Sequence, residues 1–279
     1  MAILYSLVTA IAFTVSNIFF RLAAKDEKKL SALSSYGFLA GLFFIPLMFF
    51  DDGMRIEITP NSYFFIGSLI GWTVFQYLIV WLNNKIEAST NALLSQTVSV
   101  FSFILGIVLF AGSFSWMKFL GVFAITTGNS LLFVGKSRIE LDKAFWVRTL
   151  LSLTLSFTYL FDSLASPNFG LPIYAFIAYT IPSAILMILT KTKVVEFIDL
   201  LKRKFFPIFM VCVGGAVGYW FLIKAYSFDN ISVVIPVVSS STILTVVASG
   251  IFLKEREGLL KKIVLAILVF GGVVILGLA

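Results

Sequence analysis

Two ionisable residues, Asp162 and Lys224, lie inside long apolar stretches of this 279-residue sequence. Each lies near the end of its stretch, and both ends face the same side if the stretches cross a membrane. A charge at bilayer depth costs roughly 2.5–3.5 kcal/mol on the insertion scale, so such residues are usually functional. Three interpretations remain open: the two pair with one another, they bind opposite ends of a zwitterionic or anionic substrate, or each reaches separately to the lipid headgroups.

Polar and aromatic side chains at helical spacing mark further candidates, because a helix that faces lipid carries few polar groups. The candidate substrate-binding residues are Asn17, Trp72, Gln76, Asn91, Ser95, Tyr159, Asp162, Trp220, Lys224, Ser239 and Ser240. Small polar residues at this spacing also allow two helices to approach closely, which is the alternative for the serines. Trp72 and Trp220 could line a cavity and stack on a flat or cationic solute, or they could only pack between helices.

Pro236 interrupts one apolar stretch and removes a backbone hydrogen-bond donor there. A kink at this position could serve as a hinge for gating. It could equally be a static bend that neighbouring helices tolerate.

The elements that must position these residues are ten apolar stretches, each long enough to cross a bilayer. The composition is 59% hydrophobic and 13% charged, and the mean hydropathy is +1.02, so lipid must solvate much of the surface. No water is present in the bilayer core to bond the backbone N–H and C=O groups, so they must bond to one another within helices. The sequence therefore predicts an all-α polytopic membrane protein with ten transmembrane helices. The stretches are 2–22, 30–50, 63–82, 88–110, 117–135, 145–165, 171–190, 206–226, 232–253 and 259–279.

The two halves of the sequence resemble one another. When the second half is laid over the first, Ser16-Asn17 falls on Thr158-Tyr159 and Tyr77 falls on Tyr219. A duplicated unit with an odd number of spans inserts upside down relative to its copy. We therefore expect two inverted five-helix repeats, residues 1–138 and 139–279.

The charge distribution predicts the orientation. The net charge is +7, and nearly all Lys and Arg residues lie in the loops after odd-numbered stretches, including Arg148 in the central linker. The positive-inside rule places these loops in the cytoplasm and both termini outside. Basic residues in short loops contact lipid headgroups, so nucleic-acid binding is not expected. One cysteine and no histidine argue against a disulfide, a metal site or a cofactor.

The C-terminal part of the sequence carries a more specific pattern. Lys224-Ala225, Ser232 with Pro236, and Leu253-x-Glu255 precede a glycine-rich last stretch. This pattern resembles EamA-type carriers of the drug/metabolite transporter superfamily. The resemblance implies ten helices in two inverted repeats, a central substrate cavity and alternating access without ATP hydrolysis. It implies no particular substrate, and it implies cytoplasmic termini, opposite to the charge count.

The sequence thus predicts a secondary transporter, with export as the net direction, for a small polar or amphipathic organic metabolite such as an amino acid. A multidrug or nucleotide-sugar/phosphate exchanger of the same superfamily is an alternative. An intramembrane lipid-modifying enzyme or a non-transporting scaffold is the alternative from another class, although no converging catalytic set is present. The expected partners are a small molecule, the cell membrane, and a coupling proton or counter-substrate, with a monomeric or homodimeric protein.

Overall fold

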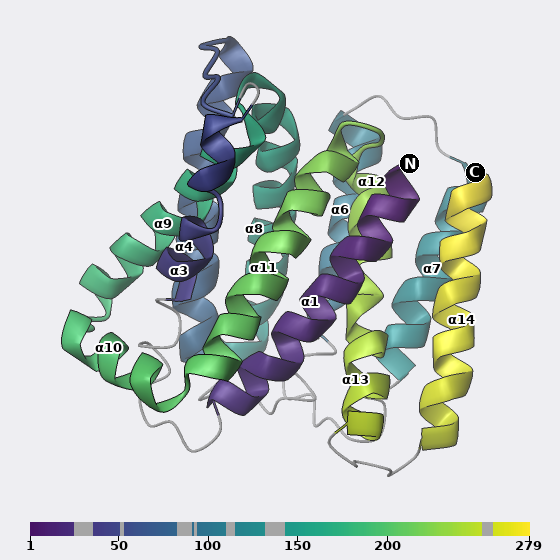
Figure 1. Ribbon diagram of the computed structural model, residues 1–279. Coiled ribbons are helices and arrows are strands. Elements are labelled where there is room, and N and C mark those ends of the chain that lie inside the picture. The colour runs from purple at the N-terminus through teal and green to yellow at the C-terminus, as the bar shows by residue number, and fades with distance from the viewer. Residues whose placement is uncertain are drawn as a thin grey trace.

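A computed structural model describes residues 1–24, 36–50, 53–82, 91, 94–109, 115–131, 143–252 and 259–279, and within these ranges the chain is helical (Figure 1). The first half contains α1 (Ala2–Ala24), α3 (Tyr36–Leu42), η1 (Pro46–Phe49), η2 (Pro60–Tyr63), α4 (Phe64–Leu82), α6 (Thr97–Leu109) and α7 (Trp116–Leu131). The second half contains α8 (Lys143–Ala165), η3 (Ser166–Asn168), α9 (Leu171–Leu189), α10 (Val194–Arg203), α11 (Phe205–Tyr226), α12 (Ile231–Ser239), α13 (Ser241–Phe252) and α14 (Leu259–Leu278).

Six helical stretches of the described chain are long and apolar enough to cross a membrane. They are Ala2–Ala24, Pro60–Ile79, Lys143–Asn168, Leu171–Leu189, Phe205–Tyr226 and Ile231–Ala248, and three shorter apolar helices cover Tyr36–Phe49, Thr97–Leu109 and Ile263–Leu278. The all-helical membrane fold is confirmed, whereas the count of ten spans and their inverted arrangement stay predictions. The expected stretch 232–253 is two helices, because the chain turns at Ser240 between α12 and α13.

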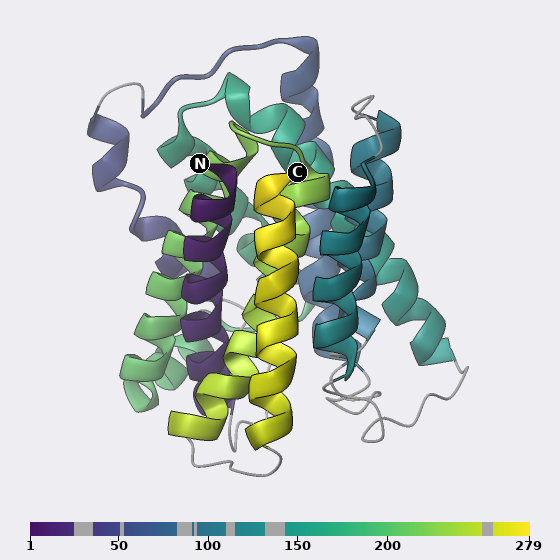
Figure 2. The same cartoon turned by 90° about the vertical axis from the view of Figure 1, so that its right-hand side faces the viewer.

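The helices pack in pairs that join the two halves of the chain. The first helix, α1, lies along α11, and α4 lies along α8 (Figures 1 and 2). Both pairs rely on glycines: a methyl group on Gly214 would collide with α1 at Ser16, and one on Gly71 would collide with Thr158 of α8. Close approach of this kind is typical of helices in lipid, where small residues form the interface.

Three further pairs also join the halves: α3 packs against α9, α6 against α12, and α7 against α14. The outer faces are apolar. On α14, for example, Leu260, Ile267 and Val274 are 77%, 68% and 60% exposed at a spacing of seven residues. A stripe of this kind suits contact with lipid tails, as expected from the high hydrophobic content of the sequence.

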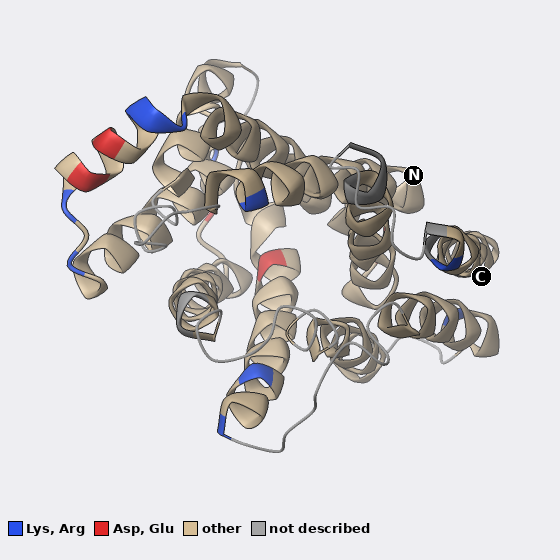
Figure 3. Ribbon diagram, turned by 90° about the horizontal axis from the view of Figure 1, so that it is seen from below, with Lys and Arg blue, Asp and Glu red and all other residues tan. Residues whose placement is uncertain are grey.

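Both chain ends lie on the same side of the helices, and α10 lies on the other side (Figure 1). Seen from that other side, Lys, Arg, Asp and Glu are sparse among the helices and gather on α10 at the edge of the molecule (Figure 3). On the side of the termini, the segment before η2 meets the segment around η3. The Glu57 amide donates to the Asn168 carbonyl at 2.8 Å, and the Gly170 amide donates to the Arg55 carbonyl at 2.7 Å.

One charge is not where the sequence analysis placed it. Arg148 was expected in the cytoplasmic linker, but it lies in the second turn of α8 and is 3% exposed. Residue 148 already falls inside the expected stretch 145–165, and α8 packs its face at this position into the interior. Arg148 therefore does not support the count of cytoplasmic charges, although the remaining basic residues keep the same bias.

Candidate functional site

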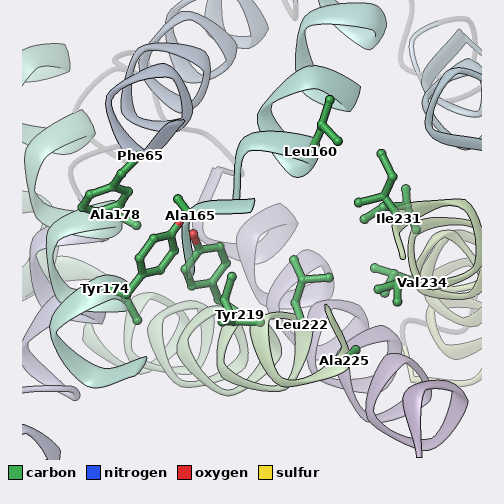
Figure 4. Close-up of a cluster of buried hydrophobic side chains, with 14 of the residues drawn as sticks. Phe65, Leu160, Ala165, Tyr174, Ala178, Tyr219, Leu222, Ala225, Ile231 and Val234 are labelled. Atoms are coloured by element: carbon green, nitrogen blue, oxygen red, sulfur yellow. The ribbon is translucent and has the colours of Figure 1, made fainter. Parts of the chain in front are cut away.

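The Asp162 carboxylate lies at the junction of four helices. Asp162 is on α8 and is fully buried, at 0% exposure. Its Oδ1 accepts hydrogen bonds from Ser68 Oγ on α4 and from Tyr174 Oη on α9, the latter at 2.6 Å. Its Oδ2 accepts from Trp72 Nε1 on α4 at 3.1 Å and from Tyr219 Oη on α11 at 3.2 Å. Figure 4 shows the rings of Tyr174 and Tyr219 with their hydroxyl ends directed toward the same region near Ala165.

Helical spacing explains this convergence. Ser68 and Trp72 are four residues apart on α4, so both side chains leave the same face of that helix. Four donors fill the four main acceptor positions of the two carboxylate oxygens, which is the arrangement that suits an ionised carboxylate. In the described chain Asp162 forms no ion pair with Lys or Arg. The negative charge is thus held by neutral donors alone.

A cavity of about 240 Å³ adjoins two of these donors. Its walls come from α1, α3, α4, α8, α9 and α11, which are helices of both halves of the chain. The lining residues are Phe13, Ser16, Asn17, Tyr36, Trp72, Phe75, Gln76, Tyr159, Ala178, Tyr179, Gly215 and Tyr219. None of them is charged, and most are aromatic.

The aromatic walls are held by edge-to-face contacts. The Trp72 ring packs edge-on against Tyr159 at a centroid distance of 5.6 Å and against Tyr219 at 6.1 Å. Tyr179 meets Tyr219 in the same way at 5.4 Å. Such pairs are favourable because the positive edge of one ring faces the negative face of another. The hydrogen bonds to Asp162 fix Trp72 and Tyr219 in this arrangement.

One polar atom of the cavity has no partner in the protein. The Oε1 atom of Gln76 is buried and accepts no hydrogen bond. Gln76 lies one turn beyond Trp72 on α4, so its side chain faces the same cavity. A buried unpartnered carbonyl is costly unless a ligand or water supplies the donor.

The structure therefore brings together five of the candidates from the sequence. Asn17, Trp72, Gln76 and Tyr159 line one cavity, and Asp162 lies directly behind its Trp72 and Tyr219 walls. The other six candidates lie elsewhere.

Lys224 and Trp220 lie outside this cavity. Lys224 Nζ is 5.3 Å from the centroid of the Trp220 ring, and that ring stacks on Phe44 at 6.1 Å. Trp220 lines a separate cavity of about 440 Å³ beside Arg55 and Ser166, on the side of the termini. The interpretation that Asp162 and Lys224 pair is wrong, because the carboxylate is fully engaged by neutral donors and the ammonium group lies over a ring.

Asn91 and Ser95 take part in two other sets of polar contacts. Asn91 Oδ1 accepts from Arg148 Nε at 2.6 Å, and Arg148 Nη1 donates to Ser152 Oγ at 2.8 Å. Ser95 Oγ accepts from Gln96 Nε2 at 3.2 Å. The contacts of Arg148 lie toward the start of α8, whereas Asp162 lies toward its end.

Ser239 and Ser240 lie at the break between α12 and α13. Ser239 Oγ donates to the Pro236 carbonyl at 2.6 Å, and Asn129 Nδ2 donates to the Ser239 carbonyl at 3.1 Å. Ser240 is fully buried, and its Oγ has no partner. Pro236 has no N–H, so the backbone carbonyl one turn earlier loses its helical donor. The Ser239 hydroxyl then competes for the Pro236 carbonyl, and together these two effects explain the break at Ser240.

Sequence reasoning missed three partners of Asp162 and one buried cation. Ser68, Tyr174 and Tyr219 were not candidates, although Tyr219 occupied a repeated position. Arg148 was read as a loop charge. Spacing along one helix could have identified Ser68, since it precedes Trp72 by one turn, but the contact with Tyr174 joins different helices.

In the described part of the chain, no group of three or more His, Cys, Asp or Glu residues could hold a metal ion. The groups available at the cavity suit recognition: aromatic rings, the side-chain amides of Asn17 and Gln76, and a carboxylate behind the wall.

Comparison with known proteins indicates a family. Residues 1–134 match the model of the EamA-like transporter family. This part of the chain belongs to that family. This EamA-like protein is a multi-pass membrane protein of the drug/metabolite transporter superfamily, whose members carry small-molecule substrates across a lipid bilayer.

A solved structure titled only as a crystal structure of a protein has a TM-score of 0.68 and 11% sequence identity to this EamA-like chain. The match covers 97% of this chain and 96% of the other. At that identity the likeness shows a shared fold and nothing of the substrate. No curated protein matches the chain.

Proposed function

We propose that this protein is a secondary carrier that exports a small polar or amphipathic organic metabolite, such as an amino acid, by alternating access. The observation that carries the proposal is the aromatic cavity of about 240 Å³, lined by both halves of the chain, with the unpartnered carbonyl of Gln76 inside it. A binding site between two halves is what alternating access requires, because relative movement of the halves can expose it to either side.

The packing of the helices supports two inverted repeats, residues 1–138 and 139–279. If each helix of the first half corresponds to one of the second, the pair α1 with α11 has its counterpart in α8 with α4. The pair α4 with α9 likewise has its counterpart in α11 with α3. The pairs α3 with α9, α6 with α12, and α7 with α14 each map onto themselves. A pseudo-two-fold relation between the halves would produce this pattern.

Two alternatives are less well supported. A nucleotide-sugar or phosphate exchanger needs cationic groups at its anion, but none of the residues that line the cavity is Lys or Arg. A multidrug carrier remains compatible with the aromatic walls. An enzyme would need converging nucleophilic or acid/base groups at a reactive position, whereas the family is a transporter family.

Counterflow in proteoliposomes tests the proposal. The purified protein is first screened by thermal shift against amino acids, amines and sugars, since a ligand that binds only the folded form raises its apparent stability. The binding solutes are then loaded into vesicles and exchanged against radiolabelled solute outside. A carrier exchanges solute, a channel conducts without exchange, and an enzyme consumes it. Absence of exchange for every binding solute would contradict the proposal.

Matched variants link transport to the cavity. Alanine at Trp72 or Gln76 should lower exchange while leaving the yield of folded protein nearly unchanged for Gln76, whose carbonyl has no protein partner to lose. Alanine at Tyr77, which is 46% exposed on the same helix, is the control and should exchange normally. Equal loss in Gln76 and Tyr77 variants would argue against this cavity.

The orientation and environment are part of the proposal. We place the protein in the cell (inner or plasma) membrane, with a coupling proton or counter-substrate, as a monomer or homodimer. From the bias of the basic residues, both termini should lie outside the cytoplasm. A C-terminal reporter that is active only in the cytoplasm should therefore stay silent, and a strong signal would favour the opposite orientation.

A further inference from the structure

We propose that the cavity lined by Trp72 and Tyr219 binds an organic amine as its ammonium cation, and that the ligand must keep at least one N–H group. This proposal rests on the proposed transport function, because it assigns the substrate class of the same cavity. It follows from three separate features of the site: its aromatic walls, its uncompensated carboxylate and its unpartnered carbonyl.

Aromatic side chains dominate the walls. Trp72, Tyr159, Tyr179 and Tyr219 surround the cavity, and their mutual contacts are edge-to-face. The face of an aromatic ring is electron-rich, and it attracts ammonium groups most strongly where water is excluded. Among the described residues, no Lys or Arg lines the cavity to compete for those rings.

The carboxylate behind the wall adds a fixed negative charge. Asp162 is fully buried and has no basic partner in the described chain. Trp72 and Tyr219 connect it to the cavity, because each lines the cavity and donates its polar hydrogen to Oδ2. Hydrogen bonds to an anion polarise the donors, so both rings become more electron-rich than in an apolar core. Charge and ring faces thus favour the same kind of ligand.

The Gln76 carbonyl decides which cations fit. Its Oε1 is buried without a partner and can only accept a hydrogen bond. A primary or secondary ammonium supplies the missing donor, and a quaternary ammonium cannot. A site built to hydrogen-bond a ligand N–H discriminates against the analogue without it, because the buried acceptor is then left unpaired.

The volume limits the size. At about 240 Å³ the cavity is below the range of roughly 300–1,000 Å³ that holds drug-sized molecules. The expected ligand is a small amine with an apolar or aromatic portion.

Binding of four related probes to the purified protein in nanodiscs tests this directly. The probes are phenethylamine, its N,N,N-trimethyl derivative, 2-phenylethanol and 3-phenylpropionate, which keep one ring and change only the head group. We expect phenethylamine to bind about tenfold more tightly than the trimethyl compound and the alcohol, and the carboxylate to bind most weakly. Equal affinity for the alcohol or the carboxylate would overturn the cation assignment, as would no measurable binding of phenethylamine at millimolar concentration.

Variants assign the preference to residues. Gln76→Met removes the acceptor at similar size, and it should abolish the difference between phenethylamine and its trimethyl derivative. Asp162→Asn should remove the preference for the amine over the alcohol. If Asp162→Asn does not fold, the four probes on the unaltered protein still decide the question. Tyr77→Phe, on the outward face of α4, is the control and should leave all four affinities unchanged. A trimethyl derivative that binds the unaltered protein as well as phenethylamine would overturn the N–H requirement.

Failure of this inference is distinguishable from failure of the transport proposal. Exchange of neutral or anionic solutes without amine preference would leave a carrier and overturn the amine site. Tight amine binding without exchange of any solute would keep the site and overturn the carrier.

Discussion

At one end of α8 the Asp162 carboxylate accepts four hydrogen bonds, whereas near the other end the Arg148 guanidinium donates two to the described residues. Both residues are buried, at 0% and 3% exposure. The carboxylate has its acceptor positions filled, but of the five guanidinium N–H groups two have a partner in the described part of the chain. Among the described residues, the same helix therefore buries one charge in a completed site and the other in an incomplete one.

The two buried charges should therefore contribute differently to the stability of the fold. A charge in a completed site supports the packing of the helices that supply its donors, here α4, α9 and α11. A charge in an incomplete site loses hydration free energy on burial, and its few contacts do not offset that loss. Substitutions at the two ends should therefore differ in their effect on unfolding.

The largest effect is expected for Asp162→Leu. This change leaves Ser68, Trp72, Tyr174 and Tyr219 without their acceptor in a dry interior, so it should lower the free energy of unfolding by about 3–5 kcal/mol. Denaturant titration in mixed micelles measures it. Asp199→Leu on the exposed face of α10 is the control and should stay within about 0.5 kcal/mol. Similar values for both would remove the distinction between completed and incomplete sites.

Deleting a single donor should cost less. Tyr174→Phe removes one hydrogen bond to Asp162 and should destabilise by about 1.5–3 kcal/mol. Tyr226→Phe is matched to it, because the Tyr226 hydroxyl is buried without a partner and its removal should be neutral or slightly stabilising. The difference between these two variants, measured in the same titration, gives the value of one contact to the carboxylate.

The segment of α8 between the two charges can be tested through its neighbour α4. A methyl group on Gly71 meets Thr158 closer than atoms can pack, so Gly71→Ala should cost about 1–3 kcal/mol. Gly271 on α14 has no atom within 4 Å of such a methyl group. Gly271→Ala should therefore be neutral or stabilise by up to about 1 kcal/mol through helix propensity. Equal costs at the two positions would show that the close contact between α4 and α8 is not rigid.

The smallest effect is expected for Arg148→Met. The change removes a buried cation without an ionic partner and keeps most of the side-chain volume, so the free energy of unfolding should change by no more than about 1 kcal/mol. Lys143→Met, at the exposed start of α8, is the control. A loss comparable to that of Asp162→Leu would show that the two ends of α8 are equally important for folding.

Much of the fold could be predicted from the sequence, because apolar length alone decides where a chain crosses lipid. The stretch expected at 171–190 is the helix Leu171–Leu189, and that expected at 206–226 is Phe205–Tyr226. A kink was expected at Pro236, whereas α12 runs through that residue and ends at Ser239. The cause of the break at Ser240 is a local competition of the Ser239 side chain for the Pro236 carbonyl, which hydropathy does not register.

The site was predicted in part, for a reason that also explains what was missed. Asp162 and Gln76 were identifiable because polar groups are rare in these stretches. Tyr174 and Ser68 were not, because common residues become partners only when distant helices meet; Ser68 and Asp162 are 94 positions apart. Arg148 was missed because it lies close to the start of its stretch, where it was grouped with Lys143 of the linker.

The contact between loops of the two halves has a consequence for the rate of movement. Besides the two backbone hydrogen bonds described above, Arg55 Nη2 donates to the Pro167 carbonyl at 3.0 Å, and Thr59 Oγ1 donates to Asn168 Oδ1 at 2.8 Å. If the mouth on the side of the termini opens during transport, these contacts either move as one unit or break together. Breaking them together requires enthalpy. Opening on this side should therefore slow steeply on cooling, and low temperature should trap the protein with this mouth shut.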